Sequence, residues 1–410
     1  MKVAVIGGGW AGIAAAVELT ATGVATTLFE AGRVLGGRAR SITVDGQTLD
    51  NGQHILLGAY GETLALMRRV GADPDLLFER RPLQVIDNSG FRMVLPKLPA
   101  PLNVAWGLLT AKGVGWSEKL KTAFWMERIK ADGFQLQGDL SVAVWLDQAG
   151  QTGRLRRHLW EPLCLAALNT PAERASAQLF ANVLRDSLGS PKREATDLLI
   201  PRVDLGRLLP EPAGRWLEIH GTQLKLGTRI DQLESNGEGF SVAGEQFSAV
   251  ILATAPQHLA KLWPTIAASY EYEPIATIYL QFDRQTSLSF PLINLLGKHG
   301  QWVVDRSNGL LACILSGHGA WETLSDEALA HALHQELAIP QAVRWHKVIR
   351  EKRATFSCRP HTQRPLATTD HPGLWLAGDY TWAEYPATLE GAVRSGLHAA
   401  RLCIQNARLS

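Results

Sequence analysis

The stretch that decides the fold is KVAVIGGGWAGIAAAVELTATG, residues 2–23. Residues 2–6 form a short apolar run rich in β-branched side chains, which predicts a buried parallel strand. Gly7, Gly9 and Gly12 follow at GxGxxG spacing; they permit a tight turn, close approach of the backbone to a pyrophosphate, and close packing of a helix on the strand. The helix is predicted to end near Gly23, and its N-terminus supplies an anion-binding site.

A second predicted strand, residues 25–29, ends at Glu30. An acidic side chain at this distance can accept hydrogen bonds from the hydroxyls of an adenosine ribose, and it disfavours a 2′-phosphate. A lone GxGxxG is weak evidence, because ordinary glycine turns also contain it. Strand, glycines, helix, strand and acid in this order are far more specific for a dinucleotide.

Composition limits the remaining possibilities. The 410 residues are 46% hydrophobic and 20% charged, which favours two domains with a substantial core. The formal net charge is only +2, so a nucleic-acid partner is not expected. The four cysteines are widely spaced, which favours reduced thiols in a cytosolic protein. No segment reaches the roughly 20 apolar residues that span a bilayer.

Other chemical motifs are weak. His331, His334 and Glu336 have helical spacing, but without HExxH or a cysteine partner they are expected on an exposed helix face, and no metal site is predicted. The chain has no GxSxG elbow and no GxxxxGK[ST] loop. Serine hydrolase and P-loop functions are therefore disfavoured.

Two further motifs identify the type of dinucleotide. AGRVLGGRARS follows Glu30, and near the other end GLWLAGD, residues 373–379, predicts a buried strand ending in Gly-Asp before a helix-like stretch at 388–400. Together with the N-terminal fingerprint, these motifs resemble the FAD-dependent amine oxidase and phytoene desaturase superfamily. The resemblance implies FAD as cofactor, with Arg38 near its pyrophosphate and Asp379 at its ribityl and pyrophosphate region.

Three stretches carry a closer resemblance, to the squalene-associated FAD-dependent desaturases, the hydroxysqualene dehydroxylase family. They are DNGQHILLGAY (50–60), LWEPLCLAALNTP (159–171) and FANVLRDSLGS (180–190). This family reductively removes the hydroxyl of hydroxysqualene to give squalene for hopanoid synthesis. Three alternatives stay open: a carotenoid-type desaturase, another FAD amine oxidase, and a prenyl-binding escort protein of the same fold, such as the Rab GDP-dissociation inhibitors.

The resemblance also implies the architecture, an α/β protein with a Rossmann-like FAD-binding domain built from discontinuous segments and an inserted mixed α+β substrate domain. Residues 1–59, 201–257 and 366–410 are assigned to the FAD-binding domain, and residues 60–200 and 258–365 to the substrate-binding domain. Residues 226–233 resemble the strand that contacts adenine, and 249–256 the strand that leads back to the substrate domain. The predicted cofactor contacts are Gly7, Gly9, Trp10, Ala11, Gly12, Glu30, Gly36, Gly37, Arg38, Gly52, Gln53, His54, Ile230, Gly378, Asp379 and Thr388.

Reductive dehydroxylation needs a proton donor for the departing hydroxyl and aromatic faces near the developing cation. By resemblance, residues 50–54 pass alongside the flavin ring. His54 is then a proton donor or substrate-orienting group, unless it only satisfies core hydrogen bonds. Asp50 orients His54 or caps a turn at Asn51 and Gly52. The predicted catalytic residues are His54, Asp50, Tyr385 and Glu384, and the predicted substrate contacts are Tyr60, Trp160, Asn169 and Trp382.

Residues 98–116, LPAPLNVAWGLLTAKGVGW, are apolar but interrupted by prolines. Two interpretations stay open: a core element under the substrate domain, or an interfacial element with Trp and Lys at its edge. The expected partners are a C30 isoprenoid substrate and NAD(P)H or a reductase as electron donor. The expected location is the cytoplasm, with peripheral contact at the inner face of the cytoplasmic membrane left open.

Overall fold

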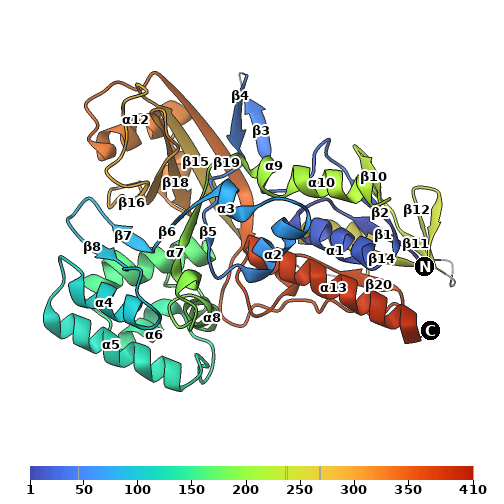
Figure 1. The fold of residues 1–410 in the computed structure, drawn as a ribbon, viewed down its shortest axis with the longest axis horizontal. Coiled ribbons are helices and arrows are strands. Elements are labelled where there is room, and N and C mark those ends of the chain that lie inside the picture. Colours follow the sequence, from blue (N-terminus) through green and yellow to red (C-terminus); the bar gives the residue numbers. More distant parts are fainter. Residues whose placement is uncertain (45, 236, 238, 267–268, 410) are drawn as a thin grey trace.

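The computed structural model describes residues 1–44, 46–235, 237, 239–266 and 269–409. A five-stranded parallel sheet, on the right of Figure 1, has the order β10-β2-β1-β14-β20. Its strands come from distant parts of the chain: β1 (Lys2–Ile6), β2 (Ala25–Glu30), β10 (Gln223–Leu226), β14 (Ala249–Leu252) and β20 (Leu374–Leu376). The dinucleotide-binding part is therefore assembled from discontinuous segments, as the motifs predict.

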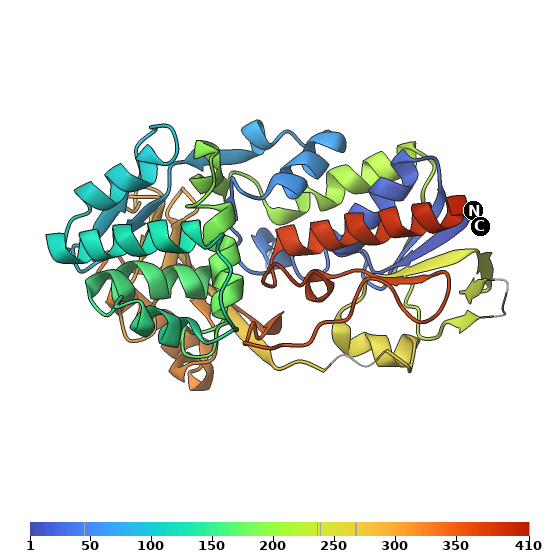
Figure 2. The ribbon, with the colours of Figure 1, turned by 90° about the horizontal axis from the view of Figure 1, so that it is seen from below.

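Helices cover one face of this sheet. α1 (Trp10–Ala21) follows the glycine turn and ends just before Gly23, in agreement with the prediction. α13 (Leu389–Leu409) and α10 (Pro210–Ile219) lie beside α1 (Figure 2). Val3 and Val5 pack in the hydrophobic core on this side, whereas Phe29 on the opposite side meets Phe247 edge to face at 5.9 Å. Phe247 belongs to a small sheet of β11 (Glu234–Ser235), β12 (Phe240–Val242) and β13 (Glu245–Phe247).

A second, antiparallel sheet has the order β16-β17-β18-β15-β19. Along β15, the strand between β18 and β19, Ala276, Ile278 and Leu280 pack against α12 (Asp326–Leu337). Ile275 and Thr277 point to the other face and line a cavity, as the two-residue alternation of a strand requires. The strands are β15 (Tyr272–Gln281), β16 (Leu292–Asn294), β17 (Trp302–Asp305), β18 (Leu310–Ser316) and β19 (Trp345–Phe356).

A group of helices lies on the left of Figure 1. The helix-like run at 142–168 is interrupted at Gly150, whose φ of 65° is left-handed. The group comprises α4 (Leu102–Thr110), α5 (Trp116–Ala131), α6 (Val142–Gln148), a π-helical turn (Arg156–Trp160) continuous with α7 (Glu161–Leu168), and α8 (Ala177–Asp186).

Short elements connect these parts. Three small sheets are formed by β3 (Ser41–Val44) with β4 (Gln47–Asp50), by β5 (Leu56–Leu57), β9 (Leu198–Pro201) and β6 (Phe78–Arg81), and by β7 (Gln84–Ile86) with β8 (Arg92–Val94). The remaining helices are α2 (Gly61–Arg69), α3 (Pro74–Leu77), α9 (Leu205–Leu208) and α11 (Leu259–Leu262).

Two predicted boundaries differ from the structure. The strand expected at 226–233 is β10, which ends at Leu226, because the chain leaves the sheet at Gly227 with a φ of 68°. α2 falls in the segment assigned to the substrate domain but lies against α13. The buried carboxylate of Glu390 accepts the backbone N–H groups of Glu62 and Thr63, and this fixes the start of α2 on the FAD-binding side.

The contact of α1 with α13 depends on the absence of a side chain at Gly396. A Cβ at this position would overlap the carbonyl oxygen of Ala11. We expect Gly396→Ala to lower the free energy of unfolding by about 3 kcal/mol, because the helices must separate. Gly61→Ala is the matched control, since Gly61 also lies in a helix and has open space around it. Urea unfolding of both variants tests this, and equal stability would contradict the packing argument.

Candidate cofactor and substrate site

One cavity of about 740 Å³ joins the two sheets. At one end it is lined by the glycine turn after β1 and by Glu30. At the other end it is lined by apolar side chains of α7, α8 and the antiparallel sheet, among them Leu163, Phe180 and Leu292. The cavity thus has a polar end on the nucleotide-binding sheet and an apolar end among the substrate-side elements.

The polar end has the properties of a dinucleotide site. Gly9, Trp10 and Ala11 line it at the start of α1, which has no side-chain cap and no acidic residue in its first turn. The positive end of the helix dipole therefore remains available to a phosphate. Thr254 also lines the cavity, and its buried hydroxyl has no hydrogen-bond partner in the structure. A buried polar atom of this kind is suited to a ligand group.

Glu30 organises the glycine turn as well as facing the cavity. Its carboxylate accepts the backbone N–H of Gly8 at 2.7 Å and that of Gly32 at 2.6 Å. These bonds hold the carboxylate at the end of β2, where its remaining lone pairs can accept ribose hydroxyls. Gly12 alone among the predicted cofactor contacts does not line the cavity. A Cβ there would overlap the carbonyl oxygen of Gly7, so Gly12 serves helix packing.

Arg38 and Asp379 form an ion pair on the cavity wall. Arg38 Nη2 donates to Asp379 Oδ2 at 2.8 Å, and Nη1 donates to the carbonyl oxygen of Ala354 at 2.6 Å. The carboxylate of Asp379 raises the pKa of Arg38. One guanidinium therefore joins the GGR loop, the Gly-Asp motif and the end of β19.

Most predicted cofactor contacts come together around this ion pair. The segment after β10 forms part of the cavity wall at 228–231, which explains why Ile230 lines it although no strand is present there. The predicted contacts that line the cavity are Gly7, Gly9, Trp10, Ala11, Glu30, Gly36, Gly37, Arg38, Gly52, Gln53, His54, Ile230, Gly378, Asp379 and Thr388.

Asp50 lies behind the cavity wall rather than on it. Its buried carboxylate accepts the backbone N–H of Leu205 at 2.7 Å and Arg306 Nη1 at 3.0 Å. Arg306 also donates to Gln53 Oε1 at 2.8 Å. Burial raises the pKa of Asp50, although Arg306 opposes this. The prediction of a catalytic Asp50 is not supported, because its oxygens already anchor the 50–54 loop. Arg306 lies in no motif and could not be predicted.

His54 lines the cavity, but its geometry does not favour a proton donor. Nδ1 lies 3.0 Å from the carbonyl oxygen of Gly52, which can only accept, so the ring carries its proton on Nδ1. Burial lowers the pKa of His54 below its ordinary value, so the ring is neutral at neutral pH. Nε2 is then an acceptor, and His54 is suited to orient a hydroxyl group.

Two tyrosines on the cavity wall retain their protons. Burial raises the pKa of Tyr60 well above its ordinary value, with a smaller contribution from Glu390. Burial also raises the pKa of Tyr385, whose hydroxyl donates to Asp186 Oδ2 at 2.6 Å. The proton of Tyr385 is therefore committed to Asp186, which makes Tyr60 the better candidate for a transferable proton.

Three other predicted residues lie outside the cavity. Trp160 is buried in the helical part, where it meets Trp125 edge to face at 5.2 Å. Glu384 is exposed, and Trp382 lines a separate small depression near His398. The loop after Asp379 leaves the cavity at 381–384, whereas Tyr380, Tyr385 and Thr388 on either side of that segment line it. The prediction of a catalytic Glu384 and of substrate contacts at Trp160 and Trp382 is not supported.

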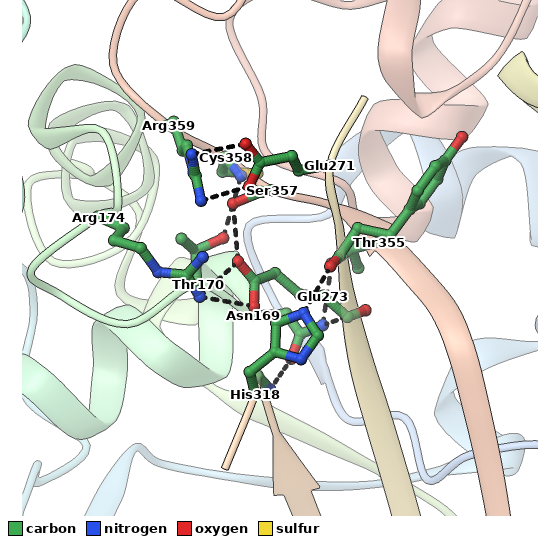
Figure 3. A network of polar contacts seen from close by, with 12 residues as sticks. Asn169, Thr170, Arg174, Glu271, Glu273, His318, Thr355, Ser357, Cys358 and Arg359 are labelled. Carbon is green, nitrogen blue, oxygen red and sulfur yellow. Dashed lines mark hydrogen bonds and ion pairs between the residues drawn. The ribbon is translucent and has the colours of Figure 1, made fainter. Parts of the chain in front are cut away.

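Asn169 lines the cavity, but its side-chain amide is bonded to the protein (Figure 3). Nδ2 donates to Thr355 Oγ1 at 2.9 Å, and Oδ1 accepts the backbone N–H of Gly317 at 3.0 Å. Nearby, the buried Glu273 carboxylate accepts Arg174 and Ser357. This network fixes the segment after α7 to the antiparallel sheet, so Asn169 shapes the cavity wall instead of offering a free polar group to a substrate.

The apolar end contains two donors without partners. Gln84 and Trp302 both line the cavity and are nearly buried, and neither Gln84 Nε2 nor Trp302 Nε1 has a hydrogen-bond partner in the structure. Both groups were absent from the sequence prediction, because each lies in a short strand without a recognisable motif. An apolar cavity with a few polar groups is typical of sites that orient a mostly hydrocarbon ligand. In the described ranges, no cluster of His, Cys, Asp and Glu suited to a metal ion was found.

Comparison with known proteins agrees with this geometry. Residues 10–404 match the family model described as flavin containing amine oxidoreductase. The chain belongs to the flavin-containing amine oxidoreductase family. It is 31% identical to hydroxysqualene dehydroxylase of Rhodopseudomonas palustris over 99% of both chains, and 26% identical to 15-cis-phytoene desaturase of an Oncidium hybrid cultivar, covering 99% of this chain and 78% of that protein.

The fold comparison is consistent with this assignment. A crystal structure of a putative protoporphyrinogen oxidase from Exiguobacterium sp. 255-15 superposes with a TM-score of 0.70 at 18% identity, covering 98% of this chain and 99% of that one. As a member of the family, this flavin oxidoreductase is an FAD-dependent enzyme, as the motifs predict. The glycine turn, Glu30, Arg38, Asp379 and the unpaired Thr254 hydroxyl fit FAD, and they would hold its nucleotide and pyrophosphate parts. Family membership also disfavours the escort-protein alternative.

The Arg306–Asp50 ion pair gives a test of the loop anchor. We expect Arg306→Leu to lower the free energy of unfolding by about 3 kcal/mol at neutral pH, because it leaves a buried carboxylate with one remaining donor. Adding Asp50→Asn should recover part of this loss. Arg344→Leu is the control, since Arg344 is exposed in its pair with Asp283. Urea unfolding measures all three variants; equal effects of Arg306→Leu and Arg344→Leu would contradict the anchor.

Proposed function

We propose that this flavoenzyme removes the hydroxyl of hydroxysqualene reductively to give squalene. The observation that carries the proposal is the single cavity that connects the FAD-binding end with an apolar end containing isolated hydrogen-bond donors. A C30 hydrocarbon with one hydroxyl matches this distribution of polar and apolar surface. The similarity to hydroxysqualene dehydroxylase over nearly the whole chain supports the same substrate class.

The reaction requires both a proton and a hydride. Reduced FAD, when bound, supplies the hydride. The allylic carbon–oxygen bond breaks as the oxygen receives a proton, water leaves, and the carbon receives the hydride. We assign proton donation to Tyr60, whose hydroxyl stays protonated. His54 Nε2 accepts a hydrogen bond from the substrate hydroxyl and thereby orients that hydroxyl.

The cavity wall stabilises the positive charge that develops on carbon. Phe180, Trp302 and Tyr380 line the cavity and offer aromatic faces, which attract cations. Leu163, Leu184 and Ile349 exclude water, which would otherwise capture the carbocation. We keep NAD(P)H or a reductase as the proposed source of electrons and the cytoplasm as the proposed location, in keeping with four free cysteines.

The decisive experiment is anaerobic incubation of the reduced, FAD-loaded protein with hydroxysqualene. Squalene should form in step with flavin oxidation, and the oxidised protein should form none. A parallel incubation of the oxidised protein with phytoene tests the desaturase alternative. Desaturated phytoene together with unreacted hydroxysqualene would overturn the proposal.

The roles of Tyr60 and His54 predict different kinetic defects. Tyr60→Phe should lower squalene formation roughly 10² to 10⁴-fold with FAD still bound, because the proton donor is lost. His54→Gln keeps a hydrogen-bonding group and should mainly raise KM. Stopped-flow reoxidation of the reduced flavin by substrate measures both variants. A Tyr60→Phe rate equal to that of the unmodified enzyme would remove Tyr60 from the mechanism.

The same assignment predicts the pH dependence. Since the pKa of His54 is lowered from 6.5, its neutral form persists as the pH falls below 6.5. Activity should therefore stay level through pH 6.5 and fall only when His54 is protonated at lower pH. If His54 were the proton donor, activity would instead rise as the pH decreases through its pKa. The rate of reoxidation measured against pH in the unmodified enzyme and in His54→Gln distinguishes these two outcomes.

A further inference from the structure

α4 and α5 form one end of the molecule (Figure 1, Figure 2), and exposed apolar side chains are concentrated in this part of the chain. Half of the exposed large hydrophobic residues of the described chain lie between positions 98 and 124. They form what we call the α4–α5 face: Leu98, Leu102, Trp106, Leu109, Trp116, Leu120 and Phe124. The exposed fraction reaches 75% for Phe124 and 62% for Trp116. Large exposed apolar patches mark interaction sites, so seven exposed apolar side chains on and beside two helices in contact indicate that this face has a partner.

The exposure follows from helix geometry. Trp116, Leu120 and Phe124 repeat every four residues, so they share one side of α5. On its opposite side, Trp125 and Ile129 are buried in the core. α4 has the same arrangement, with Trp106 and Leu109 outward and the buried Asn103, Gly107 and Leu108 inward. Each helix is thus held by one apolar side and presents a second to its surroundings.

Positive charge surrounds the α4–α5 face. Lys97, Lys112 and Lys121 are exposed. In the part of the chain that the structure describes, none of these three forms an ion pair; the lysines that do are Lys2, Lys225 and Lys261. The one acidic residue between positions 97 and 124 is Glu118, whose carboxylate turns inward to accept the backbone N–H of Leu155 at 2.9 Å. The face therefore combines apolar side chains with three lysines that form no ion pair among the described residues, and the exposed Glu127 follows it one turn further along α5.

The face lies close to the apolar end of the cavity. Asn103 of α4 donates from Nδ2 to Thr196 Oγ1 at 3.3 Å, and Thr196 lines the cavity. Gly107 packs against Leu95, whose backbone N–H bonds the carbonyl oxygen of the cavity residue Leu83 at 2.9 Å. α4 thus contacts the cavity wall directly at Asn103 and through one intervening residue, Leu95, at Gly107.

We propose that the α4–α5 face docks on the surface of a bilayer containing anionic lipids. Tryptophan and phenylalanine bind the boundary between headgroups and acyl chains, and lysines bind lipid phosphates. A second copy of the chain is a poorer occupant, because a two-fold contact sets the same patch, with its unpaired lysines, against itself. The proposed role of docking is delivery of a membrane-dissolved substrate, and that role alone rests on the proposed function.

Vesicle flotation of the FAD-loaded protein tests the docking. The protein should float with vesicles of phosphatidylcholine and phosphatidylglycerol in equal parts, and more weakly with phosphatidylcholine alone. Trp106→Ser with Phe124→Ser should lower binding to both at least tenfold. Lys112→Gln with Lys121→Gln should lower binding to the anionic vesicles about tenfold, because each lysine near an anionic surface strengthens binding. This second pair keeps the test valid if the first pair unfolds.

Leu76→Ser with Ile219→Ser is the matched control. Leu76 and Ile219 are as exposed as the face residues but lie on α3 and α10, and this variant should float like the unmodified protein. Absence of flotation in the unmodified protein, or equal flotation of the Trp106 and Phe124 variant, would overturn the proposal. A dimer in sedimentation that the same variant dissociates, without vesicle binding, would overturn it in favour of a self-interface.

Turnover of hydroxysqualene, supplied either in vesicles or dispersed in detergent, distinguishes a failure of docking from a failure of the proposed function. If vesicle binding fails while detergent-dispersed hydroxysqualene still yields squalene, docking is wrong and the proposed function stands. If the protein floats with vesicles but forms no squalene from either vesicle-borne or detergent-dispersed hydroxysqualene, the proposed function is wrong and docking stands. With both correct, the Trp106 and Phe124 variant should turn over vesicle-borne substrate at least tenfold more slowly and dispersed substrate at the normal rate.

Discussion

The guanidinium of Arg38 is the constraint on which the rest of the site depends. It bonds Asp379 at the end of the C-terminal strand of the parallel sheet and the carbonyl oxygen of Ala354 in the antiparallel sheet. Three segments far apart in the sequence therefore share one planar group. Because its five N–H donors have a fixed geometry, the arginine sets the angle at which the two sheets face the cavity more strictly than a lysine would.

The contiguous motifs could be predicted because each depends on local geometry. The strand, glycine turn, helix and second strand occur within a residue or two of the predicted positions, and fifteen of the sixteen predicted cofactor contacts line the cavity. Contacts between elements could not be predicted in the same way. Arg306 lies 256 positions from Asp50, and no spacing rule relates them. Trp160 was predicted as a substrate contact because a large aromatic side chain is equally suited to a hydrophobic core and to the wall of an apolar ligand site, and the sequence does not distinguish the two.

Residues 50–54 show how burial divides roles among neighbours. Asp50 turns away from the cavity because a buried carboxylate needs charged and N–H partners, which Arg306 and Leu205 supply. Its ion pair then holds Gln53, and the carbonyl oxygen of Gly52 fixes the tautomer of His54. The polar residues that precede the apolar segment thus lie at successive depths: Asp50 anchors the loop behind the cavity wall, and His54 offers a hydrogen-bond acceptor on the wall.

The apolar end of the cavity and the α4–α5 face place opposite demands on the same group of helices. A cavity wall must exclude water, whereas a docking face must remain stable while exposed to solvent until it binds its partner. α4 meets both demands because its small residue Gly107 lets the helix pack tightly against Leu95, leaving its larger side chains free for the surface. Tight packing inside is what permits apolar exposure outside, since a loosely held helix would turn its tryptophan inward to bury it.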